Sequence, residues 1–295
     1  MSRNGVLLAF LAYIAFAISD ASIKLIGGRI DTFEIAFLGA VMGFSALPFI
    51  RRPDERYRDV LRSTVWHLWA LRAVSTGISA ASSVIAFTHL PMPEAFSLIF
   101  LMPMFVTLLS IVFLKEEVGV WRWTAIVLGF VGVLIVLRPG FRELNVGHLG
   151  ALVAGMSGAV SVVSFRMAGP REKRISLFGA GLVGILVLNG LLMLPNWSMP
   201  AGADVAFLLG YGLLSAVGQV LIMLAVQYAP ASHIAMPQYS QMAWALLFSY
   251  LLFHEPVDGV ALFGIAVICA AGMLTWARER IKLPRLRRSS VIRPR

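Results

Sequence analysis

Two opposite charges interrupt the first apolar stretch of the chain, in the segment AISDASIK at residues 17–24. A charge near the centre of a membrane-spanning helix costs about 2.5 to 3.5 kcal/mol, so such a residue is expected to have a partner or a function. Asp20 and Lys24 are four residues apart, which on a helix lets the ammonium fold back onto the carboxylate. Two interpretations stay open. The pair stabilises only the helix, or Asp20 holds a ligand amine or a proton, with Tyr13 and Lys24 on the same face.

A second polar face lies between residues 66 and 89. At 100° per residue, its polar side chains fall within about 120° of arc. They are Arg72, Ser75, Thr76, Ser79, Ser82 and Ser83. An arginine aligned with serines predicts the wall of a water-filled cavity, with Arg72, Ser79 and Ser83 as candidate binding residues. The alternative is that these small side chains only allow neighbouring helices to pack closely.

Amide side chains inside the apolar segments of the second half include Gln219, Gln238 and Gln241. An amide in hydrocarbon must be hydrogen-bonded, so Gln219 is expected to face a neighbouring helix, a cavity or a ligand. Gln238, Gln241 and Trp244 fall within about 120° of one helical face. Two amides and an indole can bind a polar head and stack on a flat or apolar body, so this face is a candidate binding surface. The alternative for Trp244 is an interfacial aromatic belt.

Other chemistry is disfavoured by the residues present. The sequence GMSG at 155–158 is similar to the GxSG of rhomboid-type intramembrane proteases, whose serine needs a histidine base at the same depth. The histidines that follow, His233 and His254, fall in an expected loop and at an expected membrane edge, so a protease is a remote alternative and no enzyme is predicted. No filter-like pattern predicts a channel. Cys269 is the lone cysteine, so we expect no internal disulfide and no metal cluster. No cofactor is predicted. Glu34 is a gate or an interfacial charge.

The elements that position these residues are membrane spans. The chain is 59% hydrophobic and only 14% charged, which is typical of a protein that crosses the membrane many times. Apolar windows long enough to span the bilayer recur along it. The windows are 5–27, 32–50, 66–89, 94–113, 121–138, 147–168, 174–194, 204–227, 234–253 and 258–276. We interpret the first window as a retained helix rather than a secretory signal, because nine more follow it.

The distribution of basic residues predicts the orientation in the membrane. With the N-terminus in the cytoplasm, 19 lysines and arginines fall in cytoplasmic segments and 3 in external ones. Both termini are therefore expected in the cytoplasm. Topology also accounts for the net charge of +10, so no nucleic-acid partner is predicted. The basic tail, residues 279–295, is expected to be a disordered strip on anionic lipid.

The two halves of the chain resemble each other. FLKEEVGVWRWTAIVLGFVGVLIV ends the first five windows and LFHEPVDGVALFGIAVICAAGMLT ends the second five, so that Glu116 aligns with Glu255. Two copies of an odd number of spans must have opposite orientations, which predicts an inverted repeat with a binding site between the halves. The expected fold is all-α, with ten transmembrane helices in two inverted five-helix repeats. The first repeat would cover 1–143 and the second 144–278.

Several longer patterns resemble one family over essentially the whole chain. SLIFLMPMFVTLLSIVFLKEEVG, GFVGVLIVLRPG and MPQYSQMAWALLFSYLLFHEPVDG are similar to EamA-type members of the drug/metabolite transporter superfamily. The resemblance implies a carrier of small organic metabolites, often an exporter, whose cavity is formed by the first four helices of each repeat. One departure is that Pro103 lies 13 residues before Glu116, whereas Pro237 lies 18 before Glu255. The second helix break is therefore expected nearer the cytoplasmic end.

Together these patterns predict a multi-pass secondary transporter of the bacterial inner membrane that works by alternating access. The mixture of charges, amides and indole suits a small zwitterionic or amino-acid-like metabolite, and the resemblance favours export. Uptake of a vitamin, nucleoside or sulfonium-type metabolite is the alternative. The cavity would be lined by the first, third, eighth and ninth helices. No ATP-binding motif is present, so an ion or substrate gradient would supply energy. A coupling proton, and a monomer or homodimer, stay open.

Overall fold

The fold was analysed in a computed structural model that describes residues 3–115, 119–138, 143–169, 171–228, 237–238, 240–255 and 257–282. Over these residues the regular elements are α-helices and short 3₁₀ helices, and none is a strand. The all-α fold class predicted from the sequence is therefore confirmed.

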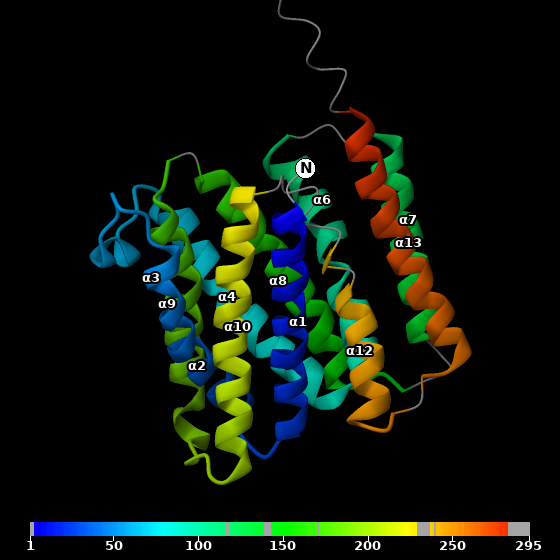
Figure 1. The fold of residues 1–295 in the computed structure, drawn as a ribbon, viewed down its shortest axis with the longest axis horizontal. Helices are drawn as coiled ribbons and strands as arrows, with labels where there is room; N and C mark the ends of the chain where they lie inside the picture. Colours follow the sequence, from blue (N-terminus) through cyan, green and yellow to red (C-terminus); the bar gives the residue numbers. More distant parts are fainter. Residues whose placement is uncertain are drawn as a thin grey trace, which may run out of the picture.

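The helices follow one another up and down the bundle (Figure 1). The first half contains α1 (Arg3–Ile26), α2 (Thr32–Gly43), η1 (Phe44–Ala46), α3 (Leu47–Ile50), η2 (Tyr57–Leu61), α4 (Trp66–His89), α5 (Met92–Ile99), α6 (Met102–Phe113) and α7 (Val120–Leu137). The second half contains α8 (Val146–Ala168), α9 (Arg174–Met193), η3 (Leu194–Asn196), α10 (Ala203–Tyr228), α12 (Ser240–Leu251) and α13 (Gly259–Lys282).

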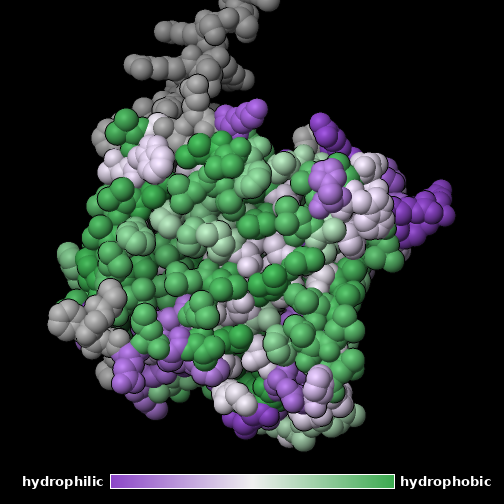
Figure 2. All heavy atoms as spheres, turned by 180° about the vertical axis from the view of Figure 1, so that it is seen from behind, coloured by the Kyte–Doolittle hydropathy of each residue, from purple (hydrophilic) through white to green (hydrophobic). Residues whose placement is uncertain are grey.

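Length and composition make most of these helices membrane spans. Seven helical segments in the described residues are long and apolar enough to cross a bilayer, and α7 and α13 contain shorter apolar stretches. The ninth expected span is represented by α12 and helical residues 237–238, while 229–236 and 239 lie outside the described residues. Figure 2 shows apolar side chains across the middle of one face of the molecule and hydrophilic ones gathered toward its two ends. The chain is therefore a multi-pass membrane protein.

Local signals explain where several helices begin. The side chain of Asp31 accepts a hydrogen bond from the backbone N–H of Phe33 and caps α2, and Asn145 caps α8 in the same way. The fourth expected span is interrupted at residues 100–101, between α5 and α6. Pro103 lies in the first turn of α6, where its missing N–H leaves no helical bond unmade. The proline thus marks the start of a new helix rather than a kink within one.

The two halves of the chain make equivalent contacts with each other. The first span of each half (α1 or α8) packs most extensively against the third span of the other half (α10 or α4). The last spans, α7 and α13, pack against each other at one side of the bundle (Figure 1). This symmetry agrees with two inverted repeats. We call the face where α1 begins, at the top of Figure 1, the upper face, and the face where α1 ends the lower face.

Candidate functional site

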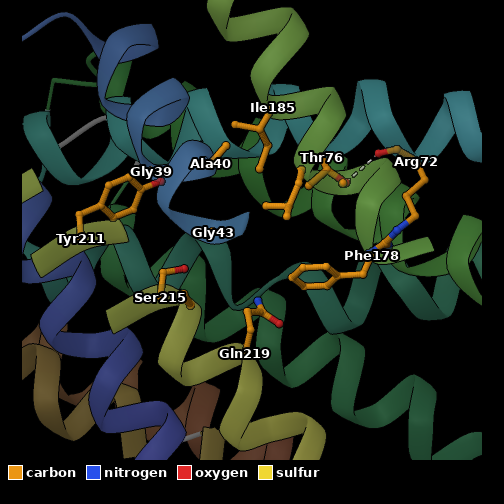
Figure 3. Close-up of a pocket in the computed structure, with 13 residues that line it drawn as sticks. Gly39, Ala40, Gly43, Arg72, Thr76, Phe178, Ile185, Tyr211, Ser215 and Gln219 are labelled. Carbon is orange, nitrogen blue, oxygen red and sulfur yellow. Dashed lines mark hydrogen bonds between the residues drawn. The ribbon is translucent and has the colours of Figure 1, made fainter. Parts of the chain in front are cut away.

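A cavity of about 160 Å³ lies between two helices of each half (Figure 3). Its lining from α2 and α4 is Gly39, Ala40, Gly43, Arg72 and Thr76, and its lining from α9 and α10 is Phe178, Gly181, Leu182, Ile185, Tyr211, Ser215, Ala216 and Gln219. α2 and α9 are the second spans of their halves, and α4 and α10 are the third. The cavity therefore lies where equivalent helices meet, which is where inverted-repeat membrane proteins bind ligands.

Glycines bring the cavity helices into close contact. A Cβ at Gly184 would lie only 1.9 Å from the carbonyl oxygen of Ala73, and a Cβ at Gly77 would lie 2.8 Å from the carbonyl oxygen of Gly184. Both obstacles are backbone atoms, so α4 and α9 can touch here only through glycine. On the opposite wall, a Cβ at Gly39 would lie 2.2 Å from the ring of Tyr211, which places that ring directly over α2.

Arg72 contributes positive charge to the cavity wall. Its Nε donates to the carbonyl oxygen of Leu177 at 2.6 Å, and its Nη1 donates to the carbonyl and hydroxyl oxygens of Ser161 at 3.0 and 2.9 Å. Within the described residues no carboxylate pairs with it and no group accepts from its Nη2, which would be 3.8 Å from a Cβ at Gly181. The guanidinium also lies 4.9 Å from the centroid of the Phe165 ring. Arg72 can therefore offer two N–H donors, and a charge that no described carboxylate neutralises, to an anionic group.

Asp20 supplies a carboxylate near the same cavity. It is half-buried in the lower half of α1, and no described residue forms a hydrogen bond or ion pair with it. Asp20 is not among the residues that line the cavity, but Tyr211 is, and it contacts the neighbouring position of α1. At the preceding position, the Ser19 hydroxyl donates to the carbonyl oxygen of Tyr211 at 2.8 Å and holds α1 against α10. The Asp20 carboxylate is thus available to a cationic group inside the bundle.

The spacing of Lys24 and Asp20 suggested an ion pair between them, but Lys24 bonds to other groups. Its Nζ lies 2.9 Å from Oε1 of Glu255 and donates to the carbonyl oxygen of Leu90 at 2.6 Å. It also lies 5.2 Å from the centroid of the Phe253 ring. The physical reason is that a carboxylate, a carbonyl and an aromatic ring converge on the ammonium at the lower face. An i, i+4 pair supplies only one partner.

Two of the remaining candidates in the first half contact neighbouring helices. The Ser79 hydroxyl donates to the carbonyl oxygen of Ala154 on α8 at 3.0 Å. Ser83 is half-buried one turn farther along α4. Tyr13 packs beside Ala9 and Ala225, where α1 meets α10. The structure thus places Ser79 at the contact between α4 and α8, and the exposure of the α4 stripe to water remains a prediction.

The candidates in the second half lie on two sides of α1. Gln219 is exposed and lines the cavity with Arg72. Gln241 is buried, and Gln238 and Trp244 are half-buried, on or just before α12. α12 packs against α1 and α5, and Figure 1 shows α1 between α10 and α12. The structure therefore brings Arg72 and Gln219 to one cavity and places the amide and indole face across α1 from it.

Comparison with known families identifies the family to which this architecture belongs. The model of the EamA-like transporter family matches the chain twice, at residues 3–138 and 145–277. The chain belongs to this family. The two matches also account for the repeat and for the exchange symmetry of the EamA-like bundle. A solved crystal structure has the same fold, with a TM-score of 0.59, 16% sequence identity, and coverage of 94% of this chain and 98% of the other.

Curated relatives of this EamA-like protein are named as transporters. A riboflavin transporter of Vibrio cholerae is 28% identical over 223 residues, covering 75% of this chain and 74% of the relative. An S-adenosylmethionine uptake transporter of Rickettsia prowazekii is 23% identical over 278 residues, covering 94% of each chain. A pseudopaline exporter, CntI, of Pseudomonas aeruginosa is 24% identical over 274 residues, covering 91% of this chain and 95% of the relative. These names describe uptake as well as export.

The resemblance implied that the second span of each repeat helps to form the cavity, but the residue patterns named no candidate on it. Gly39 and Gly43 are spaced four residues apart in α2, and Gly181 lies on the equivalent helix α9. Small residues at this spacing are the signal for close helix approach, and close approach exposes backbone to a cavity. Tyr211 was also missed, because its role follows from the absence of a side chain at Gly39.

Glu34 forms a contact between the two halves of this EamA-like fold. It is fully buried in the first turn of α2, and its Oε2 accepts from the backbone N–H of Ser198 at 3.1 Å and from its hydroxyl at 3.3 Å. Its Oε1 has no hydrogen-bond partner among the described residues. Ser198 follows η3 on the lower face, so Glu34 joins the start of α2 to the connection before α10.

Proposed function

We propose that this protein is a secondary transporter that exports a small zwitterionic or amino-acid-like metabolite by alternating access. The observation that carries the proposal is a pair of opposite charges inside the bundle, Arg72 and Asp20, neither of which has an oppositely charged partner among the described residues. A zwitterion supplies the complementary carboxylate and ammonium. Desolvated charges of this kind stabilise the helices poorly, and they favour a ligand that neutralises both.

The remaining cavity groups suit a ligand of mixed polarity. Tyr211, Ser215 and Gln219 offer hydroxyl and amide groups along one wall, and Phe178 and Ile185 offer apolar surface on the other (Figure 3). An amino-acid-like molecule would place its charged groups toward Arg72 and Asp20 and its side chain on the apolar wall. The bilayer and this small molecule are the partners that the proposal requires.

A second candidate is uptake of a vitamin, nucleoside or sulfonium-type metabolite. The names of the riboflavin and S-adenosylmethionine relatives favour it. A sulfonium carries a fixed positive charge, and Asp20 would bind it as it would bind an ammonium. The two candidates differ in direction. An uncharged vitamin also differs in not needing Arg72, whereas the carboxylate of an amino acid or of S-adenosylmethionine would require the guanidinium.

Energy would come from a gradient, since the sequence has no ATP-binding motif. Asp20 is the candidate carrier of a coupling proton, because its carboxylate lies inside the bundle without a described bond. The orientation is inner-membrane with both termini in the cytoplasm, supported by the 19 to 3 distribution of basic residues. The repeats would divide at residues 143 and 144.

The test is transport in proteoliposomes with a panel of an amino acid mixture, riboflavin and S-adenosylmethionine. Asp20→Asn keeps the size of the side chain and removes its charge, and Arg72→Gln removes the guanidinium. For a zwitterion, both variants should lower counterflow by at least about tenfold, as expected for the loss of a charge-assisted bond. Asp204→Asn, a carboxylate on the lower face paired with Arg29 at 2.5 Å, is the matched control and should transport like the parent.

The outcomes separate the candidates. If Asp20 binds a substrate cation, Asp20→Asn should lose binding at every pH. If it carries a proton, binding and exchange should survive while accumulation driven by pH disappears. Transport of riboflavin that is unaffected by Arg72→Gln would favour the second candidate. Normal transport by both variants at all pH values would contradict a site at these charges and move it to Gln241 and Trp244.

A further inference from the structure

Lys24 and Glu255 form a bond between separate parts of the bundle at the lower face. α1 packs along α10, and α4 packs along α8, so each pair is held together along its length. The Lys24 ammonium joins α1 to the end of α4 through the carbonyl of Leu90, and to the connection between α12 and α13 through Glu255. The hydroxyl of Ser249 donates to the other oxygen of Glu255 at 3.1 Å. The Lys24 side chain is only 10% exposed.

The upper face has a bond at the equivalent positions of the other repeat. Lys24 lies two residues before the end of α1, and Arg166 lies two residues before the end of the equivalent helix α8. Arg166 Nη1 donates to the Ser110 hydroxyl on α6 at 3.2 Å. Ser249 and Ser110 each lie within the last turn of equivalent helices, α12 and α6. Glu116, which aligns with Glu255, lies outside the described residues.

We propose that these contacts are two alternating latches of the transport cycle. The lower latch is Lys24 with Ser249 and Glu255, and the upper latch is Arg166 with Ser110. The inference rests on the proposed function, because a transporter built from inverted repeats opens one face as it closes the other. Opening the lower face requires the two helix pairs to separate there, and that separation breaks the bonds of Lys24. The bond of Arg166 joins α8 to α6, as the bond of Lys24 to Glu255 joins α1 to the end of α12, so by the symmetry of the repeats we infer that it breaks when the upper face opens.

The surroundings of Lys24 favour closure of the lower face. Its side chain is nearly buried, with a carboxylate, a carbonyl and an aromatic ring around the ammonium. Separating a largely buried charge from its partner leaves that charge desolvated. The lower latch therefore favours the state with the lower face closed.

The experiment measures access to a buried position behind the lower latch. Ala245 is fully buried on α12, one turn deeper than Ser249, so Ala245→Cys in a Cys269→Ser background reports opening of that seam. A membrane-impermeant maleimide is applied to vesicles of both orientations, with Ala201→Cys in the lower-face loop as the marker of sidedness. Lys24→Met and Glu255→Gln should each raise the labelling rate of Ala245→Cys from the lower side by at least tenfold. The charge-swapped double variant Lys24→Glu with Glu255→Lys should return it toward the parent rate.

Two further variants distinguish a latch from a general loosening. Arg166→Gln should act in the opposite direction, so adding it to Lys24→Met should lower the labelling rate again. Arg29→Gln breaks an exposed pair of the same face that lies within the α1 and α10 pair, and it should leave labelling unchanged. Parent-like labelling in both Lys24→Met and Glu255→Gln, or increased labelling in Arg29→Gln and Arg166→Gln as well, overturns the proposal. Labelling needs no substrate, so a failed transport assay leaves this result interpretable.

Discussion

The contact between α4 and α9 predicts a strong effect of a single methyl group at Gly184. An added Cβ would lie 1.9 Å from the carbonyl oxygen of Ala73 and 2.5 Å from its Cα. No side chain can rotate away, so the two helices must separate by roughly 1.5 Å to restore ordinary contact, and overpacking of this kind costs about 1 to 3 kcal/mol. The gain in helix propensity from glycine to alanine is smaller, at most about 1 kcal/mol.

The consequence reaches the cavity. Arg72 on α4 donates to the carbonyl of Leu177 on α9 at 2.6 Å, and a separation of the helices stretches that bond. Gly184→Ala should therefore lower the midpoint of thermal unfolding of the purified protein in detergent, by roughly 2 to 10 °C. It should also weaken binding of any ligand that Arg72 holds.

The matched control is Gly129→Ala, because a Cβ there would have ordinary contact at 3.9 Å with Ala271. That variant should unfold at the parent temperature or slightly above it, since alanine favours the helix. If Gly184→Ala unfolds with the parent midpoint, α4 and α9 do not touch through this glycine. The arrangement of α4 and α9 in the cavity wall would then be wrong as well.

Three other predictions concern the ends of the bundle. A reporter fused to the C-terminus should be cytoplasmic and one inserted near Trp197 periplasmic, and opposite labelling at both would reverse the orientation. The hydrogen bond from Lys173 holds the pKa of Asp59 below its ordinary value of 3.8, helped by a backbone bond from Arg56. This stabilisation is present above about pH 4 and lost as the pH falls through the lowered pKa, so Lys173→Met should flatten the acid part of the unfolding profile measured from pH 6 to 3. Glu172 accepts from the Thr64 hydroxyl at 2.8 Å and from backbone N–H groups at the start of α4. Glu172→Ala should therefore lower the free energy of unfolding by about 1 kcal/mol. An unchanged denaturant midpoint would contradict a capping role.

The positions of the helices were predictable because they depend on local sequence. The third window, 66–89, agrees with α4, and the second, 32–50, covers α2 to α3 without a gap. The interruption at residues 100–101 was signalled by Pro103 but displaced from it, because proline is tolerated in the first turn of a helix. The extension of α13 to Lys282 was not expected, since the apolar window ends at 276 and the helix continues beyond it.

The site was less predictable because a helical wheel identifies a face and not its neighbour. Lys24 and Glu255 are separated by most of the chain, and nothing local distinguishes that partner from Asp20. The α4 stripe was recognised as polar, but it divides between a carbonyl of α8 for Ser79 and the cavity for Arg72. The cavity residues on α2 could not be predicted from the sequence without knowing that Gly39 faces α10. Contacts of this kind depend on tertiary packing.

The location of the strong contacts bears on how such a bundle can move. α4 and α9 meet closely through Gly77 and Gly184, and side-chain hydrogen bonds from Arg72 and Asn189 also join them. Lys24 and Arg166 instead make their contacts at the two faces, Lys24 at the lower and Arg166 at the upper. A change at Gly184 should therefore destabilise every conformation alike, whereas a change at Lys24 should shift the balance between conformations with a smaller effect on unfolding. Measuring both midpoint and labelling for each variant separates the two, because a population shift requires a difference in energy between states and not a loss common to both.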